Sequence, residues 1–178
     1  KEKGSLAKTN FIRNSSAHEN NYISEKGLVR LRNELLNLVD KERPKIVDIV
    51  SWAASNGDRS ENGDYIYGKK KLREIDKKIF KLTKSIKTAK PVKIGTAVDV
   101  EKVFFGASVS FKRNQKSHIE TVTILGIDEV DLAKGHVSWI SPIAKSLLGS
   151  RRGDMVTLTT KDGEDRLKII AIDYNLKD

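Results

Sequence analysis

Ala54-Ser55-Asn56-Gly57-Asp58 is the stretch of sequence that decides the fold. It separates two long segments in which apolar residues recur at spacings of three and four, a heptad pattern typical of coiled coils. Asn and Gly readily end a helix, because both tolerate left-handed backbone. The sequence therefore predicts two helices that fold back on each other as an antiparallel hairpin. The alternative is a parallel dimer of two chains, but the turn at the midpoint favours the hairpin, so we expect a monomer.

The first helical segment has Ser24 as its predicted N-cap. Its apolar positions are Leu28, Leu31, Leu35 and Leu38, and the same register continues at Ile49 and Trp52. Pro44 interrupts this segment and removes one helix hydrogen bond, at a cost of about 3 kcal/mol. We expect a bend rather than an end of the helix, because the apolar register resumes afterwards. Trp52 is interpreted as a packing residue.

The second helical segment has the same spacing, apart from a seven-residue step past Gly68. Its apolar positions are Tyr65, Leu72, Ile75, Ile79, Leu82, Ile86 and Ala89, and Pro91 and Gly95 follow them. Each arm has roughly thirty residues, or about 45 Å of helix. A hairpin of this length places its turn far from the rest of the protein.

After Gly95 the sequence changes to short segments rich in Val, Ile and Thr, which predict strands. The predicted strands are 96–100, 107–111, 119–128, 136–140, 155–160 and 166–174. Ser141 as N-cap and Pro142 in the first turn predict one short helix. The predicted fold class is α+β, with a helical hairpin before an antiparallel sheet and one short helix. The predicted division is a disordered basic tail over residues 1–21, a hairpin over 22–94 and a sheet domain over 95–178.

Composition and charge limit the classes of function. The chain has no cysteine, which excludes disulfides and thiolate chemistry. It has no run of the roughly 18 apolar residues that cross a membrane. The net charge is +10, and residues 65–96 hold eleven Lys or Arg against two acids. The excess of positive charge therefore lies on the second helix, which points to an anionic partner such as nucleic acid.

The turn between the helices holds three carboxylates in seven residues, Asp58, Glu61 and Asp64. Carboxylates at such a spacing can share a Mg²⁺ ion, although two alone would hold it weakly. Asp58 and Glu61 also have the spacing of a capping box for the second helix, with Ser60 as a rival cap. Spacing alone favours capping over metal chemistry, and the two interpretations are not exclusive.

Basic residues cover the faces of the second helix that the heptad positions leave open. They are Lys69, Lys70, Lys71, Arg73, Lys77, Lys78, Lys81, Lys84, Lys87 and Lys90. A solvated helix face is the usual interpretation of such a run, but an ordinary surface mixes both signs of charge. The one-sided charge favours contact with phosphates.

Several motifs together resemble the GreA/GreB family of bacterial transcript cleavage factors. They are Trp52-Ala53-Ala54-Ser55, Gly57-Asp58-Arg59-Ser60-Glu61-Asn62, Asp64-Tyr65, Lys70-Lys71-Leu72-Arg73-Glu74-Ile75-Asp76, Lys102-Val103-Phe104-Phe105-Gly106-Ala107 and Ser141-Pro142-Ile143-Ala144. The match runs from about Tyr22 to Tyr174 and is nearer the GreB than the GreA branch. It departs from the family pattern at Gly63 and Ile140.

The resemblance implies a cytoplasmic protein with a coiled-coil hairpin and an FKBP-like domain. In this family the globular domain docks on RNA polymerase, and the hairpin enters the secondary channel of the polymerase. The family has no catalytic activity of its own. It stimulates the polymerase to cleave the 3′ end of backtracked nascent RNA, which rescues arrested complexes.

Carried over residue by residue, the resemblance gives three groups of site residues. Asp58 and Glu61 match the catalytic acids of the tip, which are thought to help hold a Mg²⁺ ion jointly with the polymerase. Lys69, Lys70, Lys71 and Arg73 match a patch that contacts extruded RNA. Ser141 and Pro142 match a loop expected to touch the polymerase.

Three rival functions remain open at this point. A channel-binding inhibitor of polymerase would share the shape, but the intact Asp58 and Glu61 argue against it. A prolyl-isomerase-like chaperone is suggested only by the FKBP-like fold, and fold does not carry function. A nonspecific RNA- or DNA-binding coiled coil would explain the basic helix but would leave the acidic tip without a role.

Overall fold

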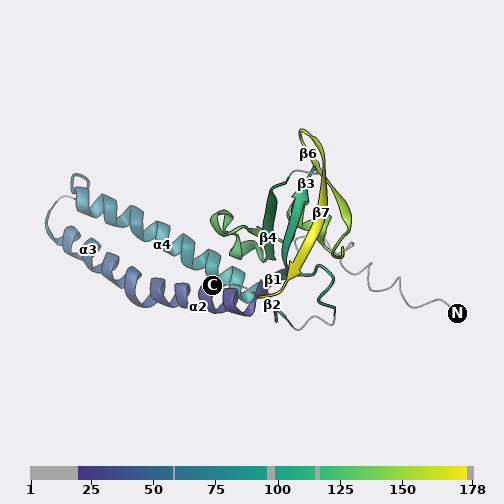
Figure 1. The fold of residues 1–178 in the computed structure, drawn as a ribbon. Helices are drawn as coiled ribbons and strands as arrows, with labels where there is room; N and C mark the ends of the chain where they lie inside the picture. Colours follow the sequence, from purple (N-terminus) through teal and green to yellow (C-terminus); the bar gives the residue numbers. More distant parts are fainter. Residues whose placement is uncertain (1–19, 58, 96–98, 115–116, 176–178) are drawn as a thin grey trace. The chain divides into compact units, whose positions relative to one another are not determined.

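The computed structural model describes residues 20–57, 59–95, 99–114 and 117–175. The chain forms two compact units, an all-helical one over Leu28–Thr88 and a second that joins the residues before Leu28 to those from Ala89 onward. Figure 1 shows helices in the first and a sheet in the second, so the predicted α+β class is confirmed. The packing assigns 22–27 and 89–94 to the unit with the sheet, whereas the sequence-based division put them in the hairpin.

The helical unit is an antiparallel hairpin, as predicted. Its first arm contains α2 (Glu25–Asn37), a π-helical turn (Leu38–Glu42) and α3 (Arg43–Ser55), and its second arm is α4 (Gly63–Thr88). Ser24 caps α2 as expected, because its Oγ accepts a hydrogen bond from the Gly27 amide at 2.9 Å. None of the described helices has the length and apolar character needed to cross a membrane.

The π-helical turn lies directly before Pro44 and explains how the first arm accommodates a proline. Pro44 has no amide hydrogen, and in a regular helix its ring would collide with the carbonyl of Asp40. In the wider turn the Arg43 amide donates to the Leu38 carbonyl, five residues back. The helix therefore continues through the proline, as predicted, but with one additional residue in that turn.

The additional residue changes which side chains of α3 face the second arm. Leu38 is 3% exposed and the next fully buried residue of this arm, Ala53, lies fifteen positions later, one more than two heptads. The predicted register instead placed Ile49 and Trp52 inside, and these are 45% and 61% exposed. The prediction that Trp52 is a packing residue is therefore wrong, because a strict heptad count does not include the π turn.

A two-stranded parallel sheet joins the ends of the hairpin sequence and was not predicted. β1 (Asn21–Ser24) pairs with β2 (Ala89–Val92), and Ile23 in β1 is fully buried. Ala89, predicted as the last apolar position of the second helix, is therefore the first residue of a strand. Lys90 likewise belongs to β2 rather than to the basic helix.

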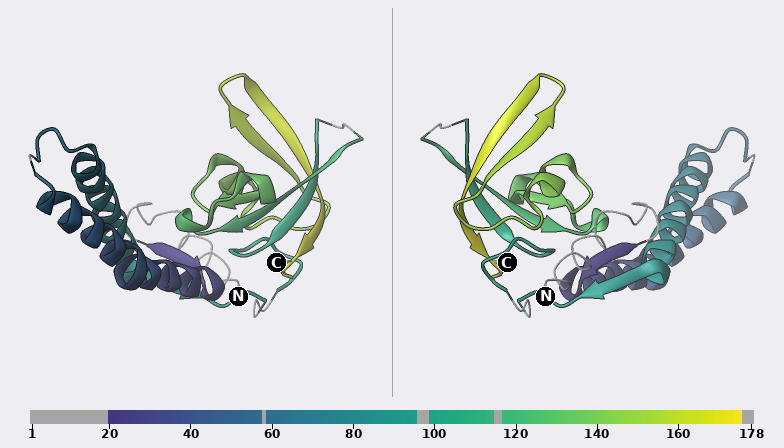
Figure 2. Two further views of the ribbon diagram at one scale, coloured as in Figure 1. Left: turned by 90° about the vertical axis from the view of Figure 1, so that its left-hand side faces the viewer. Right: turned by 90° about the vertical axis from the view of Figure 1, so that its right-hand side faces the viewer.

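The second sheet has five strands in the order β5-β4-β3-β7-β6. They are β3 (Ser108–Arg113), β4 (Ile119–Leu125), β5 (His136–Ser138), β6 (Met155–Thr160) and β7 (Gly163–Asp173). The pair β4–β5 is parallel and the others are antiparallel, so the sheet is mixed rather than wholly antiparallel as predicted. Figure 2 shows that it is strongly twisted. Of the strand predicted over 96–100, residues 96–98 lie outside the described residues, and Asp99 and Val100 are not in a strand.

One face of this sheet carries the core of the unit. The helix α5 (Pro142–Leu147) follows its predicted cap Ser141, whose Oγ accepts from the Ala144 amide at 3.3 Å. The buried cluster contains Val103, Ala107, Val109, Phe111, Ile124, Trp139, Ala144, Leu147, Leu158, Leu167 and Ile169. Trp139 is 8% exposed, and its ring meets the Tyr22 ring edge-on with 5.2 Å between the two ring centres, so it is a packing residue of this core.

A buried carboxylate ties β1 to the loop after β4. Glu129 is 5% exposed and accepts hydrogen bonds from the amides of Ser24 and Gly126, both at 2.9 Å, and from the Ser24 hydroxyl. A Cβ atom at Gly27 would lie 2.2 Å from this carboxylate, and one at Gly126 would lie 2.9 Å from it. The space that Glu129 occupies therefore requires glycine at position 27, and at position 126 the Tyr22 carbonyl, 2.5 Å from such a Cβ, adds to the same requirement.

The variant Glu129→Gln is expected to destabilise the sheet-containing unit by about 1–3 kcal/mol. The glutamine NH₂ group is itself a hydrogen-bond donor, so it cannot accept from the buried amides that bind the carboxylate in the wild type. The measurement is urea unfolding followed by Trp139 fluorescence in a Trp52→Phe background, with the exposed Glu101→Gln as the control. An unchanged unfolding midpoint for Glu129→Gln would contradict this role of the carboxylate.

Candidate functional site

The candidate site is the turn that connects α3 to α4, at the end of the hairpin. α3 ends as the sequence predicts: the Asn56 amide donates to the Ala53 carbonyl at 3.2 Å, and Gly57 follows with φ of +117°. This backbone angle favours glycine over residues with a side chain. The chain therefore leaves the helix at the predicted position.

Asn62 connects the two helices at this turn. Its Nδ2 donates to the Ala53 carbonyl at 2.9 Å, and its Oδ1 accepts from the Tyr65 amide at 3.1 Å. The first contact gives the Ala53 carbonyl a second donor beside the Asn56 amide, and the second caps the start of α4. Sequence reasoning missed this residue, although asparagine directly before a helix is a strong N-cap signal.

The capping box predicted from Asp58 and Glu61 is wrong. α4 begins at Gly63 and Asn62 caps it, so Glu61 and Ser60 lie in the turn before the cap. Asp58 lies outside the described residues. Glu61 is exposed and has no hydrogen-bond or ion-pair partner among the described residues. No contact within the described part of the chain uses its carboxylate, which is open to solvent.

Two further features shape the start of α4. The Arg59 guanidinium lies 6.0 Å from the centre of the Tyr65 ring, within the range of a cation–π contact. A Cβ atom at Gly63 would meet no atom within 4 Å, so no packing contact requires glycine there. Asp64 lies in the first turn of α4, where a negative charge interacts favourably with the helix dipole.

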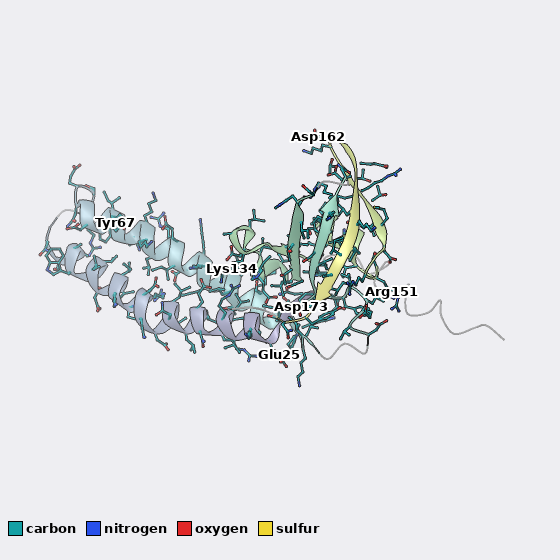
Figure 3. All side chains as sticks on the ribbon, viewed as in Figure 1. Glu25, Tyr67, Lys134, Arg151, Asp162 and Asp173 are labelled. Carbon is teal, nitrogen blue, oxygen red and sulfur yellow. The ribbon has the colours of Figure 1, made fainter. Side chains whose placement is uncertain are left out.

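The two arms approach each other closely just behind the turn. A Cβ atom at Gly68 would lie 2.7 Å from Cγ2 of Val50, so glycine permits this approach. In the heptad pattern of α4, Gly68 takes the position between Tyr65 and Leu72 where an apolar residue is missing. On the outside of the same segment, Tyr67 in α4 is 65% exposed (Figure 3).

The basic face of α4 extends from the turn toward the sheet-containing unit. Its two acids are both engaged, Glu74 with Lys71 at 3.8 Å and Asp76 with Arg43 at 2.8 Å. Lys78 pairs with Glu34 of α2 at 2.7 Å, and this hydrogen bond raises the pKa of Lys78.

The four residues predicted to contact RNA lie near the start of this face. Lys70 and Arg73 are exposed, Lys69 and Lys71 are half-buried, and Lys71 pairs with Glu74. Lys69, Lys70 and Arg73 have no ion-pair partner in the part of the chain that the structure describes. Their charges remain available for an anion.

The predicted docking residues Ser141 and Pro142 lie in the sheet-containing unit. Ser141 is half-buried because its side chain caps α5, whereas Pro142 is exposed. Ile140, directly before them, packs against the core cluster. The structure therefore gives Ser141 and Ile140 structural roles, and leaves the Pro142 ring accessible.

The donor set at the tip suits a metal ion only in part. Among the described residues there is no group of three or more His, Cys, Asp or Glu side chains that could hold a metal ion. Glu61 offers an exposed carboxylate, and oxygen donors of this type are the ligands of Mg²⁺. The described residues could therefore supply part of the ligands of a Mg²⁺ ion, and another molecule would have to supply the others.

Two family models match consecutive parts of the chain. The model described as "Transcription elongation factor, N-terminal" matches residues 21–90, and "Transcription elongation factor, GreA/GreB, C-term" matches residues 92–174. The chain belongs to the GreA/GreB family of transcription elongation factors. The predicted resemblance is confirmed.

Curated members of the GreA/GreB family match over most of the chain. A transcription elongation factor GreB of Neisseria meningitidis serogroup B is 48% identical over 159 residues, covering 89% of this chain and 97% of the relative. A GreB of Yersinia pestis is 42% identical over 156 residues, covering 88% of this chain and 90% of the relative. Among solved structures, GreA factor homolog 1 of Thermus thermophilus has 20% identity and a TM-score of 0.41, covering 86% of this chain and 99% of that one.

The variant Asn62→Ala removes both hydrogen bonds of the Asn62 side chain. We expect it to destabilise the hairpin by about 1–2 kcal/mol, and Asn62→Asp to lose less because aspartate still caps α4. Thermal melts followed by circular dichroism at 222 nm measure the difference. Equal losses for the two variants would show that the cap contributes little and that the bond to Ala53 dominates.

Proposed function

We propose that this protein binds RNA polymerase, places its hairpin in the secondary channel and stimulates the polymerase to cleave the 3′ end of backtracked RNA. The observation that carries the proposal is the division of roles at the tip. Asn62 caps α4, while the Glu61 carboxylate stays exposed and without a partner among the described residues. An exposed acid that no described residue binds is a candidate for chemistry.

The length of the hairpin supports the same proposal. α4 has 26 residues, or about 40 Å of helix, so its first turn is far from its last. Such an arm can carry the tip residues into a deep channel of another protein. The sheet-containing unit then remains outside to dock, with the exposed Pro142 as part of the contact and Ser141 shaping the loop.

In this proposal Asp58 and Glu61 hold one side of a Mg²⁺ ion whose other ligands belong to the polymerase. An ion held there would lower the pKa of bound water and would stabilise the charge on the leaving oxygen. The Glu61 side chain binds the ion and orients the attacking water by hydrogen bonding. Lys69, Lys70, Lys71 and Arg73 hold the backbone of the extruded RNA against α4. The polymerase remains the enzyme.

The deciding test is RNA cleavage in stalled, backtracked polymerase complexes with end-labelled RNA. We expect wild-type protein to stimulate cleavage and both Asp58→Asn and Glu61→Gln to reduce the stimulated rate at least about tenfold, because each removes a carboxylate from the shared ion. The control is Asp48→Asn, which removes an exposed acid from α3 of the same hairpin. Competition binding should show unchanged affinity for polymerase in all three variants.

Two outcomes would overturn the proposal in different ways. Full activity in both tip variants would leave the carboxylates without a catalytic role. Wild-type protein that binds polymerase and slows transcription without stimulating cleavage would be an inhibitor of the channel instead.

The basic face gives a second prediction. We expect Lys70→Gln combined with Arg73→Gln to reduce crosslinking of a photoreactive RNA 3′ end to the protein several-fold, and to weaken its salt dependence. The matched control is Lys78→Gln combined with Arg43→Gln, which also removes two charges from the hairpin, because these two cations are already paired with Glu34 and Asp76. An equal loss in the control would mean that only the total charge of the hairpin matters.

A further inference from the structure

A hollow of about 330 Å³ lies on the five-stranded sheet, apart from the hairpin tip and from Pro142. Its lining residues come from three neighbouring strands and their ends: Lys112, Asn114, Met155, Arg166 and Lys168. Three of the five are cations and none is an acid. The proposed function uses none of these residues, so their charge requires a separate explanation.

The alternation of the strands places these cations on the face opposite the core. Phe111, Leu167 and Ile169 are buried in the core cluster. Lys112 and Lys168 alternate with them along β3 and β7, and successive side chains of a strand point to opposite faces. Lys168 and Arg166 are exposed and Lys112 is half-buried.

Two of the cations are direct cross-strand neighbours. Lys112 on β3 pairs in register with Lys168 on β7. Like charges at directly opposite positions destabilise a sheet. The side chains of Lys112, Arg166 and Lys168 have no carboxylate partner within the described ranges. The fold therefore tolerates a repulsion here that no internal acid relieves.

The other face of the same strands shows the opposite arrangement. Arg113, next to Lys112, forms ion pairs with Glu120 at 2.9 Å and with Asp165. The hydrogen bond to Glu120 is the main cause that raises the pKa of Arg113. Internal acids thus neutralise the cation on the core side, while the outer cations stay unneutralised.

The rim of the hollow is held in place by Asn114. Its backbone is left-handed, with φ of 51°. Its amide donates to the Arg166 carbonyl and its Oδ1 accepts from the Arg166 amide, both at 2.8 Å. Its Nδ2 donates to Asp165 at 2.6 Å. These bonds fix the backbone that carries Arg166, so the cations project from a rigid surface.

We propose that this outer face, centred on Lys112, Arg166 and Lys168, binds the phosphate backbone of a nucleic-acid strand. Arg166 and Lys168 are two residues apart on one strand, which separates their Cα atoms by about 6.7 Å. This is close to the separation of successive phosphates in a nucleic-acid strand. Lys112, on the neighbouring strand, broadens the positive surface across the sheet.

The composition of the face favours nucleic acid over a protein partner. Protein interfaces are enriched in aromatic residues at their centre and depleted in lysine. Here Met155, 52% exposed, is the one apolar side chain that lines the hollow. No aromatic side chain lines it, so base stacking is not available. The binding is therefore electrostatic, with little sequence preference.

Nuclear magnetic resonance of the 178-residue chain tests the proposal, because amide shifts distinguish this face from the basic face of α4. The probe is a single-stranded oligonucleotide of about eight nucleotides, titrated at low salt. We expect shifts at the Lys112 and Thr157 amides, which border the cations on the neighbouring strands. In Arg166→Ala/Lys168→Ala the affinity read at these two amides should fall about tenfold, and the slope of log K against log[salt] should fall by about 1.4.

Three controls make the result specific. Lys134→Ala/Arg152→Ala removes the same charge from exposed positions outside the hollow, and Lys134 precedes β5 at the opposite edge of the sheet from β6 (Figure 3). It should leave affinity at this face unchanged. Glu164→Gln, which removes the next outward acid of β7, should strengthen binding. The melting temperature of Arg166→Ala/Lys168→Ala should be equal to or above that of the wild type, since the variant removes repulsion.

Three results would overturn the proposal. The first is an absence of shifts at Lys112 and Thr157 while the α4 amides respond. The second is an equal loss of affinity in the control double variant. The third is equally strong binding of polyglutamate at this face, which would assign it to acidic protein segments rather than to nucleic acid.

Discussion

Pro44 has no amide hydrogen, and this single missing donor sets the geometry of the hairpin. The helix continues past it only because the preceding turn widens to a π turn, in which the Arg43 amide reaches the Leu38 carbonyl. That turn adds one residue to the heptad count. Every apolar position of α3 is therefore rotated relative to the pattern of α2, and Ala53 rather than Trp52 faces the second arm.

The rotation also affects the turn that carries the candidate site. With a small residue, Ala53, at the inner position and Gly68 opposite Val50, the arms come close together just behind the turn. The Ala53 carbonyl then lies within reach of the Asn62 side chain, which also caps α4. A larger separation of the arms would break this bridge. The constraint at Pro44 and the cap at Asn62 thus belong to one arrangement.

Features of the fold that depend on neighbouring residues could be predicted from the sequence. The hairpin turn at Gly57, the cap at Ser24 and the short helix after Ser141 each depend on residues within a few positions, and all three were predicted. The parallel pair of β1 with β2 was missed, because it joins segments almost seventy residues apart. The buried Glu129 was missed for the same reason, since its partner Ser24 lies 105 residues away.

The same distinction between local and long-range information applies to the candidate site residues. Glu61 and the basic face of α4 were found from composition and from the family motifs, because unbalanced charge is visible in sequence. Whether a charge is neutralised is decided by contacts between distant segments: Lys78 is paired with Glu34 and Arg113 with Asp165. The side chains of Lys70 and Lys168 have no such partner in the described part of the chain. The contrast between paired and unpaired cations therefore comes from the structure alone.

The cap at Asn62 changes how the acidic tip must be judged. From spacing alone, Asp58 and Glu61 had a structural explanation, and a loss of activity in either variant could be ascribed to a frayed helix. With α4 starting at Gly63 and capped by Asn62, that explanation no longer applies to Glu61. The Glu61 carboxylate lies in the turn before α4, exposed and without a partner among the described residues. A loss of activity in Glu61→Gln would therefore point to a lost contact with another molecule rather than to a frayed helix.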